Sequence, residues 1–150
     1  MEKYTLKDLI NKKPSASNKN VMTQERVQNY VTNKSQVLEE EKGYVLFRYH
    51  GVRMALLSDE EHNRMRIIAP ITTYSALAPK IKDSLMHSNF HLALDARYAI
   101  SEDTLYAAFM HPLSTLTLED LDSALLQVAN LMLSFGKTYS SGQLDFTYKK

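Results

Sequence analysis

The 150-residue sequence contains no cysteine and only four glycines and four prolines. The absence of cysteine excludes disulfide bonds, thiolate chemistry and zinc sites with cysteine ligands. The few glycines form no Walker loop, no G-x-G-x-x-G and no G-x-S-x-G motif, so a backbone cradle for phosphate is not expected. We therefore predict no catalytic residues, no cofactor and no bound metal, and we do not expect an enzyme.

Charge of one sign and long hydrophobic runs are lacking as well. Eighteen basic and seventeen acidic residues give a formal net charge of +1, which is too small to attract nucleic acid or an anionic membrane over distance. No segment approaches the length of apolar sequence that a signal peptide or a membrane span requires. With 44% hydrophobic residues, the sequence predicts a folded cytoplasmic protein with no nucleic-acid partner and no membrane insertion.

The composition divides the chain into three parts. Residues 1–20 contain Pro14 and several lysines but little that can be buried, and we expect a mobile basic arm. Residues 21–137 are expected to form a single α+β domain. Residues 138–150 form a C-terminal tail in which Leu144, Phe146 and Tyr148 alternate with polar residues, a pattern that predicts an edge strand.

Periodicity within the domain predicts the order α-β-β-β-α-β-β-α, an antiparallel sheet with helices packed on it. Thr23 begins a helix that ends near Lys34, and a second helix with Pro79 in its first turn ends near Asn89. The predicted meander consists of strands 44–49, 53–57 and 64–69, and two more strands lie between Leu92 and Phe109. The last helix runs from 118 to 135.

The last helix has more apolar surface than one sheet can cover. Its apolar residues spread over about 220° of the helix, whereas packing on a sheet needs little more than about 100°. The surplus is covered by another helix of the chain, a second subunit or a bound partner. We expect a subunit or partner, and predict that it contacts Leu126 and Leu133, with Phe109 and Leu113 nearby.

Asp95, Arg97 and Tyr98 place a carboxylate, a guanidinium and a phenol within four residues, and these groups can form an internal hydrogen-bonded network. Alternating strand geometry places Asp95 and Arg97 on the same face, close enough for an ion pair. The cluster is either an anchor for a small ligand or partner, or a structural salt bridge at the end of a strand. The structural interpretation is favoured.

The meander also carries Arg48, Arg53, Arg64 and Arg66, which are expected on its outer face. They form either a functional basic stripe or an ordinary solvated surface, and the second is favoured.

The spacing of His87 and His91 is compatible with two metal ligands on one helical face. No HExxH-type glutamate lies between them, and Asn89 and Phe90 are expected to interrupt the helix. A structural role is therefore favoured for both histidines.

The element order, Asn89-Phe90, the strands up to Phe109, the step His111-Pro112-Leu113 and the helix from Leu118 resemble class I type III secretion chaperones of the Tir-chaperone type. The chain is similar to the YbjN family of bacterial sensory-transduction regulators in the same features. The first resemblance implies a homodimer that binds an unfolded stretch of a partner protein along apolar grooves and sheet edges. The second implies a regulator, here one that binds a small ligand near Asp95, Arg97 and Tyr98.

Overall fold

The computed structural model describes residues 21–141, so the predictions for the arm 1–20 and for the alternating residues of the tail lie outside the described part. Three helices are present in this part: α2 (Gln24–Lys34), α3 (Pro79–His91) and α4 (Leu118–Ser134). A short 3-10 helix, η1 (Tyr74–Ala76), precedes α3. The strands are β1 (Gln36–Glu41), β2 (Tyr44–Tyr49), β3 (Val52–Asp59), β4 (Arg64–Thr73), β5 (Arg97–Ser101) and β6 (Thr104–Pro112).

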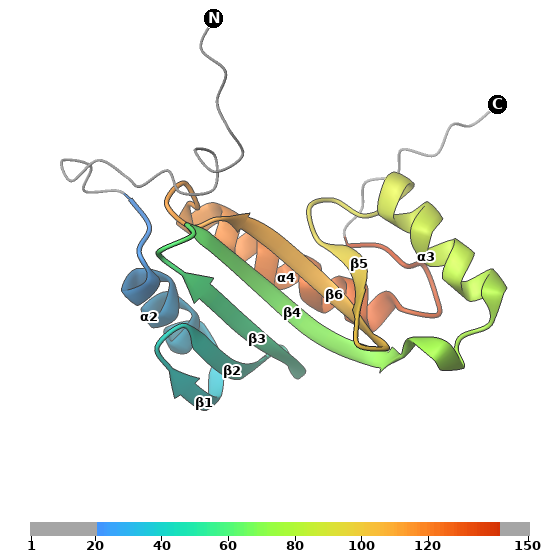
Figure 1. Ribbon diagram of the computed structural model, residues 1–150, viewed down its shortest axis with the longest axis horizontal. Coiled ribbons are helices and arrows are strands. Elements are labelled where there is room, and N and C mark those ends of the chain that lie inside the picture. The colour runs from blue at the N-terminus through green and yellow to red at the C-terminus, as the bar shows by residue number, and fades with distance from the viewer. Residues whose placement is uncertain (1–20, 142–150) are drawn as a thin grey trace, which may run out of the picture.

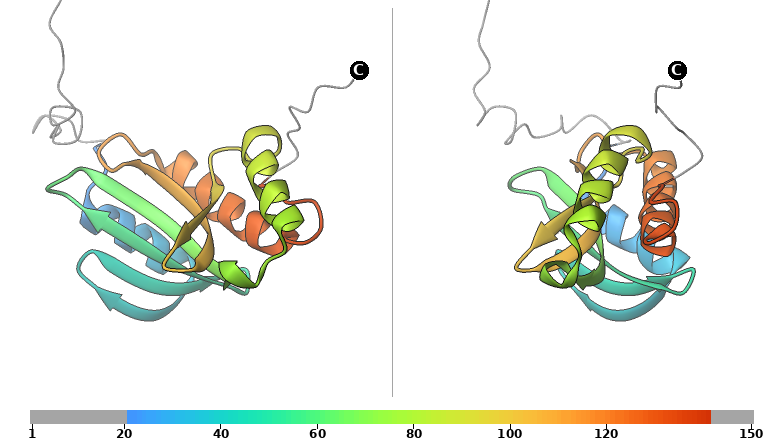
Figure 2. Two further views of the ribbon diagram at one scale, coloured as in Figure 1. Left: turned by 45° about the vertical axis from the view of Figure 1, so that its right-hand side comes forward. Right: turned by 90° about the vertical axis from the view of Figure 1, so that its right-hand side faces the viewer.

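The six strands form one antiparallel sheet in the order β1-β2-β3-β4-β6-β5. One face of it is covered, because α4 packs on β4 and β6, and α2 packs on β2 and β3. Figure 1 shows α4 behind the sheet and α3 beyond β5, at the end opposite β1. The sheet curves around α2 and α4 (Figure 2), so its other face is convex and carries no helix among the described elements.

The hydrophobic core lies between the concave face of the sheet and these two helices. Side chains at alternate strand positions point into it and are almost fully buried, among them Phe47, Met54, Leu56, Met65, Ile67 and Leu105. The helices contribute Val27 and Val31 from α2, and Leu121, Leu125, Val128 and Leu131 from α4. The core is therefore one continuous layer.

The predicted α+β architecture is confirmed, and so are several local signals. Thr23 and Thr117 cap α2 and α4, since their hydroxyls accept hydrogen bonds from Arg26 N at 3.1 Å and Asp120 N at 3.0 Å. The turn between β2 and β3 has positive φ at both His50 and Gly51, 49° and 77°, as a tight hairpin requires. Pro79 occupies the start of α3.

Three details of the predicted fold are wrong. The strand β1 was not expected, because three of its six residues are glutamates, which are depleted in strands. In the structure all six residues are exposed. The predicted strand near Leu92 begins only at Arg97, since the backbone of Asp95 and Ala96 bonds to a side chain of α4. Helix α3 continues through Asn89 and Phe90 to His91.

No helix in residues 21–141 has the length and hydrophobicity needed to cross a membrane.

A candidate protein-binding surface

Helix α4 exposes a stripe of leucines on the side that faces away from the sheet. Leu118, Leu126 and Leu133 have exposed fractions of 41%, 46% and 57%. Helix α2 lies next to this side without covering it, and Tyr30 of α2 donates a hydrogen bond of 2.7 Å to Asp122 of α4. Asp122 also raises the pKa of Tyr30, chiefly because it accepts the phenol hydrogen bond. The chain's own helices thus leave the apolar surplus of α4 partly uncovered.

The other two residues expected at the interface lie in the core. Phe109 is 4% exposed and Leu113 is 2% exposed. Phe109 points into the concave face from β6, and Leu113 is held in the loop before α4 by a hydrogen bond from its N–H to Asn63 O. In the isolated chain, therefore, Leu126 and Leu133 are the two predicted interface residues available to a partner.

The convex face of the sheet is a second uncovered surface. Leu46, Ala55, Ile68 and Ala108 are successive neighbours across β2, β3, β4 and β6 and form one apolar row. The neighbouring rows add Tyr44, Leu57, Met110, Pro70 and Tyr106. This surface was not predicted, although apolar runs such as Met54-Ala55-Leu56-Leu57 have the composition of strands that are covered on both faces.

Arginines surround this apolar row. Arg48 of β2 and Arg53 of β3 are direct cross-strand partners on the convex face, and Arg66 and Arg97 lie on the same face of β4 and β5. Within residues 21–141, none of these four guanidinium groups has a carboxylate oxygen within 4.0 Å. Two like charges placed opposite each other destabilise a sheet, so the Arg48–Arg53 pair is maintained at a cost in stability.

We expect Arg48→Glu to stabilise the folded chain, because it replaces a like-charged cross-strand pair by an opposite-charged one. The expected gain in free energy of unfolding is about 0.5–1 kcal/mol, measured by urea unfolding. Arg48→Gln should give a smaller gain, and added salt should reduce the difference between the two variants. An unchanged or lower stability of Arg48→Glu would contradict the cross-strand repulsion.

The predicted polar cluster is separated by the fold. Tyr98 points into the core, where its hydroxyl donates a hydrogen bond of 2.8 Å to Leu131 O and burial raises its pKa to about 12. The Asp95 carboxylate accepts a hydrogen bond from Gln127 Nε2 at 3.3 Å. The expected ion pair of Asp95 with Arg97 is not formed among the described residues, because Asp95 lies in the loop before β5 and not on the strand.

Asp95 and Arg97 nevertheless line a common cavity of about 350 Å³ on the rim of the sheet. Its other walls are Phe109, Met110 and His111 of β6 and Asp120 and Ser123 of α4. The Phe109 and His111 rings stack with centroids 5.9 Å apart. This cavity retains two of the three residues predicted as a polar anchor.

Gln127 is the residue that fixes the loop beside this cavity. It is 5% exposed, and its Oε1 accepts two hydrogen bonds of 2.9 Å, from Asp95 N and Ala96 N. Its Nε2 donates to Ser123 Oγ at 2.9 Å as well as to Asp95. The sequence does not indicate this role, because a single glutamine within an apolar helix carries no positional signal.

Replacing Gln127 by Ala should lower the free energy of unfolding by about 2–3 kcal/mol, since two backbone N–H groups lose their acceptor inside the protein. Urea unfolding followed by circular dichroism measures the loss. Ser123→Ala is the matched control, because it removes a partner of Nε2 but leaves both backbone bonds intact, and it should cost less than about 1 kcal/mol. Equal losses in the two variants would contradict this role of Gln127.

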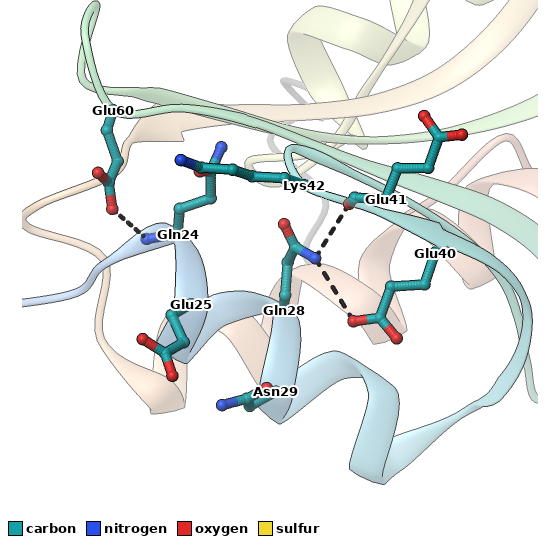
Figure 3. Close-up of a pocket in the computed structure, with 8 residues that line it drawn as sticks. All are labelled: Gln24, Glu25, Gln28, Asn29, Glu40, Glu41, Lys42 and Glu60. Carbon is teal, nitrogen blue, oxygen red and sulfur yellow. Dashed lines mark hydrogen bonds between the residues drawn. The ribbon is translucent and has the colours of Figure 1, made fainter.

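A broad pocket of about 580 Å³ lies between α2 and the β1–β2 turn. Figure 3 shows Glu25, Glu40, Glu41 and Glu60 around it. Gln28 crosses its floor and bonds to Glu41 O at 3.2 Å and to Gly43 N at 2.8 Å. The side-chain amide of Gln28 therefore joins α2 to the β1–β2 turn. We interpret the pocket as the space left at this structural contact, with glutamates at its rim.

No group of three or more histidine, aspartate or glutamate side chains in residues 21–141 is arranged to hold a metal ion. The ring of His62 lies 2.7 Å from the Asp59 carboxylate. This hydrogen bond raises the pKa of His62 and lowers that of Asp59. Both groups are exposed, Asp59 at the end of β3 and His62 in the turn that follows, and neither lies in the buried cleft expected of catalytic acid–base residues.

Comparison with known proteins gives a fold relationship. No protein-family model and no curated protein sequence matches this chain. A chain of the HopA1–SchA chaperone–effector complex is similar in structure, with a TM-score of 0.54 and 10% identity over 73% of this chain and 88% of that one. A chain of the ExsC–ExsE complex has 18% identity and a TM-score of 0.46 over 65% of this chain and 80% of that one. The first similarity shows a shared chaperone-like fold.

Proposed function

We propose that this chain is a cytoplasmic, non-enzymatic protein-binding domain that works in the manner of type III secretion chaperones. Its partner is an effector-like or regulatory protein, held by apolar burial and by strand addition. The observation that carries the proposal is the exposed leucine stripe of α4, Leu118, Leu126 and Leu133. The shared fold with a chain of a chaperone–effector complex supports it.

The stripe is large enough to stabilise an interface. Complete burial of a leucine contributes about 1.5–3 kcal/mol, and each of these side chains is roughly half exposed. Three of them together therefore contribute a few kcal/mol before the cost of ordering the partner is subtracted. A second copy of the chain and a different protein both satisfy this requirement, and we propose a homodimer as the basic unit.

Strand addition requires a free edge of the sheet. The two edges are β1 and β5, and α3 packs beside β5. All six residues of β1 are exposed, including Val37 at 39% and Leu38 at 41%. A bulge between Val37 and Glu39 and the three glutamates limit unspecific pairing, so β1 is the edge proposed to accept a strand.

Replacing Leu126 and Leu133 together by Lys should give a folded chain that has lost its interface. If a second copy covers the stripe, light scattering coupled to gel filtration should detect a dimer for the original chain and a monomer for the variant. Circular dichroism should show the same helix and strand content for both chains. Loss of the fold would instead place the two leucines in the core.

The matched control is Met86→Lys with Phe90→Lys on α3, where the side chains are 69% and 77% exposed. This pair introduces the same charges on another helix, so it separates a local effect of the α4 stripe from a general effect of added lysines. A dimer that is lost in the α3 variant but retained in the α4 variant would contradict the proposal and assign the interface to α3.

The cavity beside Asp95 and Arg97 favours a second candidate function, a YbjN-like regulator that binds a small ligand there. A ligand that binds only the folded state raises the melting temperature. A thermal-shift screen with small anionic metabolites should then give a rise that is lost in Arg97→Ala. Because Tyr98 is buried against Leu131, Tyr98→Phe should retain the ligand response. The absence of a response for all metabolites would leave protein binding as the proposal.

A further inference from the structure

The convex face of the sheet presents an apolar track with defined dimensions. Leu46, Ala55, Ile68 and Ala108 cross four strands, which places the ends of the track about 14 Å apart at the usual strand spacing. Ala55 lies between the larger Leu46 and Ile68, and Ala108 lies between Ile68 and Arg97. Both alanines are nearly covered by their neighbours, at 8% and 7% exposed, so the half-buried Leu46 and Ile68 supply most of the accessible apolar surface of the track. In the described part of the chain, no element covers it.

The four arginines have fixed positions relative to this track. Arg48 and Arg53 flank one side of it, each two residues along its strand from a member of the track. Arg66 flanks the opposite side from β4, and Arg97 closes the end beside Ala108. Two residues along a strand correspond to about 7 Å, which a carboxylate of a ligand lying on the track can bridge with an arginine side chain.

We propose that the convex face binds an extended segment of another protein in which an apolar residue lies two positions from an acidic residue on each side. Successive side chains of an extended chain point to opposite faces, so these three side chains share one face. The segment lies across the track: its apolar side chain contacts the track, and its two carboxylates pair with Arg48 or Arg53 at one border and with Arg66 at the other, which relieves the repulsion between Arg48 and Arg53. Its five residues span about 14 Å, the distance between the two borders. The inference rests on the proposed protein-binding function but uses a face distinct from the α4 stripe.

The shape of the face selects this occupant over a second copy of the chain. Two convex surfaces touch over a small area, whereas a stable complex of folded proteins buries more than about 1,000 Å². Figure 2 shows that the sheet curves away on both sides of its centre. An extended segment can follow this curvature, whereas the same convex face of a second copy cannot.

The test uses three fluorescein-labelled synthetic peptides and measures binding by fluorescence anisotropy. The first contains the sequence Glu-Ser-Leu-Ser-Glu, the second has Lys in place of Glu, and the third keeps Glu but has Ser in place of Leu. The first peptide should bind the intact chain, more weakly at high salt. The second should not bind, and the third should bind at least about fivefold more weakly, because burial of its side chains contributes nothing.

The variant Arg48→Glu with Arg53→Glu should raise the Kd of the first peptide by about tenfold or more, because attraction becomes repulsion. The matched control is Lys80→Glu with Lys137→Glu, which changes the net charge equally at exposed positions outside the sheet and should change the Kd by less than about twofold. Circular dichroism establishes that both variants fold. If the double glutamate variant does not fold, Arg48→Gln with Arg53→Gln replaces it, with a smaller loss expected.

Three results would overturn the proposal: no binding of the first peptide, equal binding of the lysine peptide, or an unchanged Kd in the arginine variant. A dimer of the intact chain that dissociates when Arg48 and Arg53 are replaced would also overturn it and place a second copy on this face. These outcomes are independent of the α4 variants, so the protein-binding function can survive the failure of this site.

Discussion

One-sided coverage of the sheet is the constraint on which the rest of the structure depends. Six strands are packed against two helices of 11 and 17 residues, and both helices lie on the concave face. Helix α4 is about 25 Å long and packs along the central strands β4 and β6. The core is complete on one side, and the apolar residues of the other side remain at the surface.

The fold was largely predictable because its signals are local. Thr23 and Thr117 cap helices by bonding to residues three positions later, and His50-Gly51 forms a turn by its own conformational preference. Features that depend on distant partners were missed. The strand β1 forms because β2 offers it a hydrogen-bonding edge. The conformation of the loop before β5 is set by hydrogen bonds to Gln127, which lies some thirty residues later in the chain.

The candidate sites were predictable to a smaller extent for the same reason. The position of Leu126 and Leu133 on the outer side of α4 follows from helical periodicity, and their exposure agrees with it. Phe109 is buried because α4 covers its face of the sheet, and which face α4 covers is determined by the packing of the whole chain. Likewise, the arginines of β2 to β5 become one group only through the register of four strands.

The β5 edge of the sheet is covered by α3, and α3 is only weakly attached. Only Leu85 and Ser88 of this helix are buried, and it is held mainly by polar contacts: Asn89 with the Tyr98 backbone, and Ser88 with Tyr139 O. Elements with few buried apolar contacts open at a lower free energy than the whole domain. Amide hydrogens of α3 and β5 are thus expected to exchange with solvent before those of β3 and β4, and each opening briefly gives the sheet a second free edge.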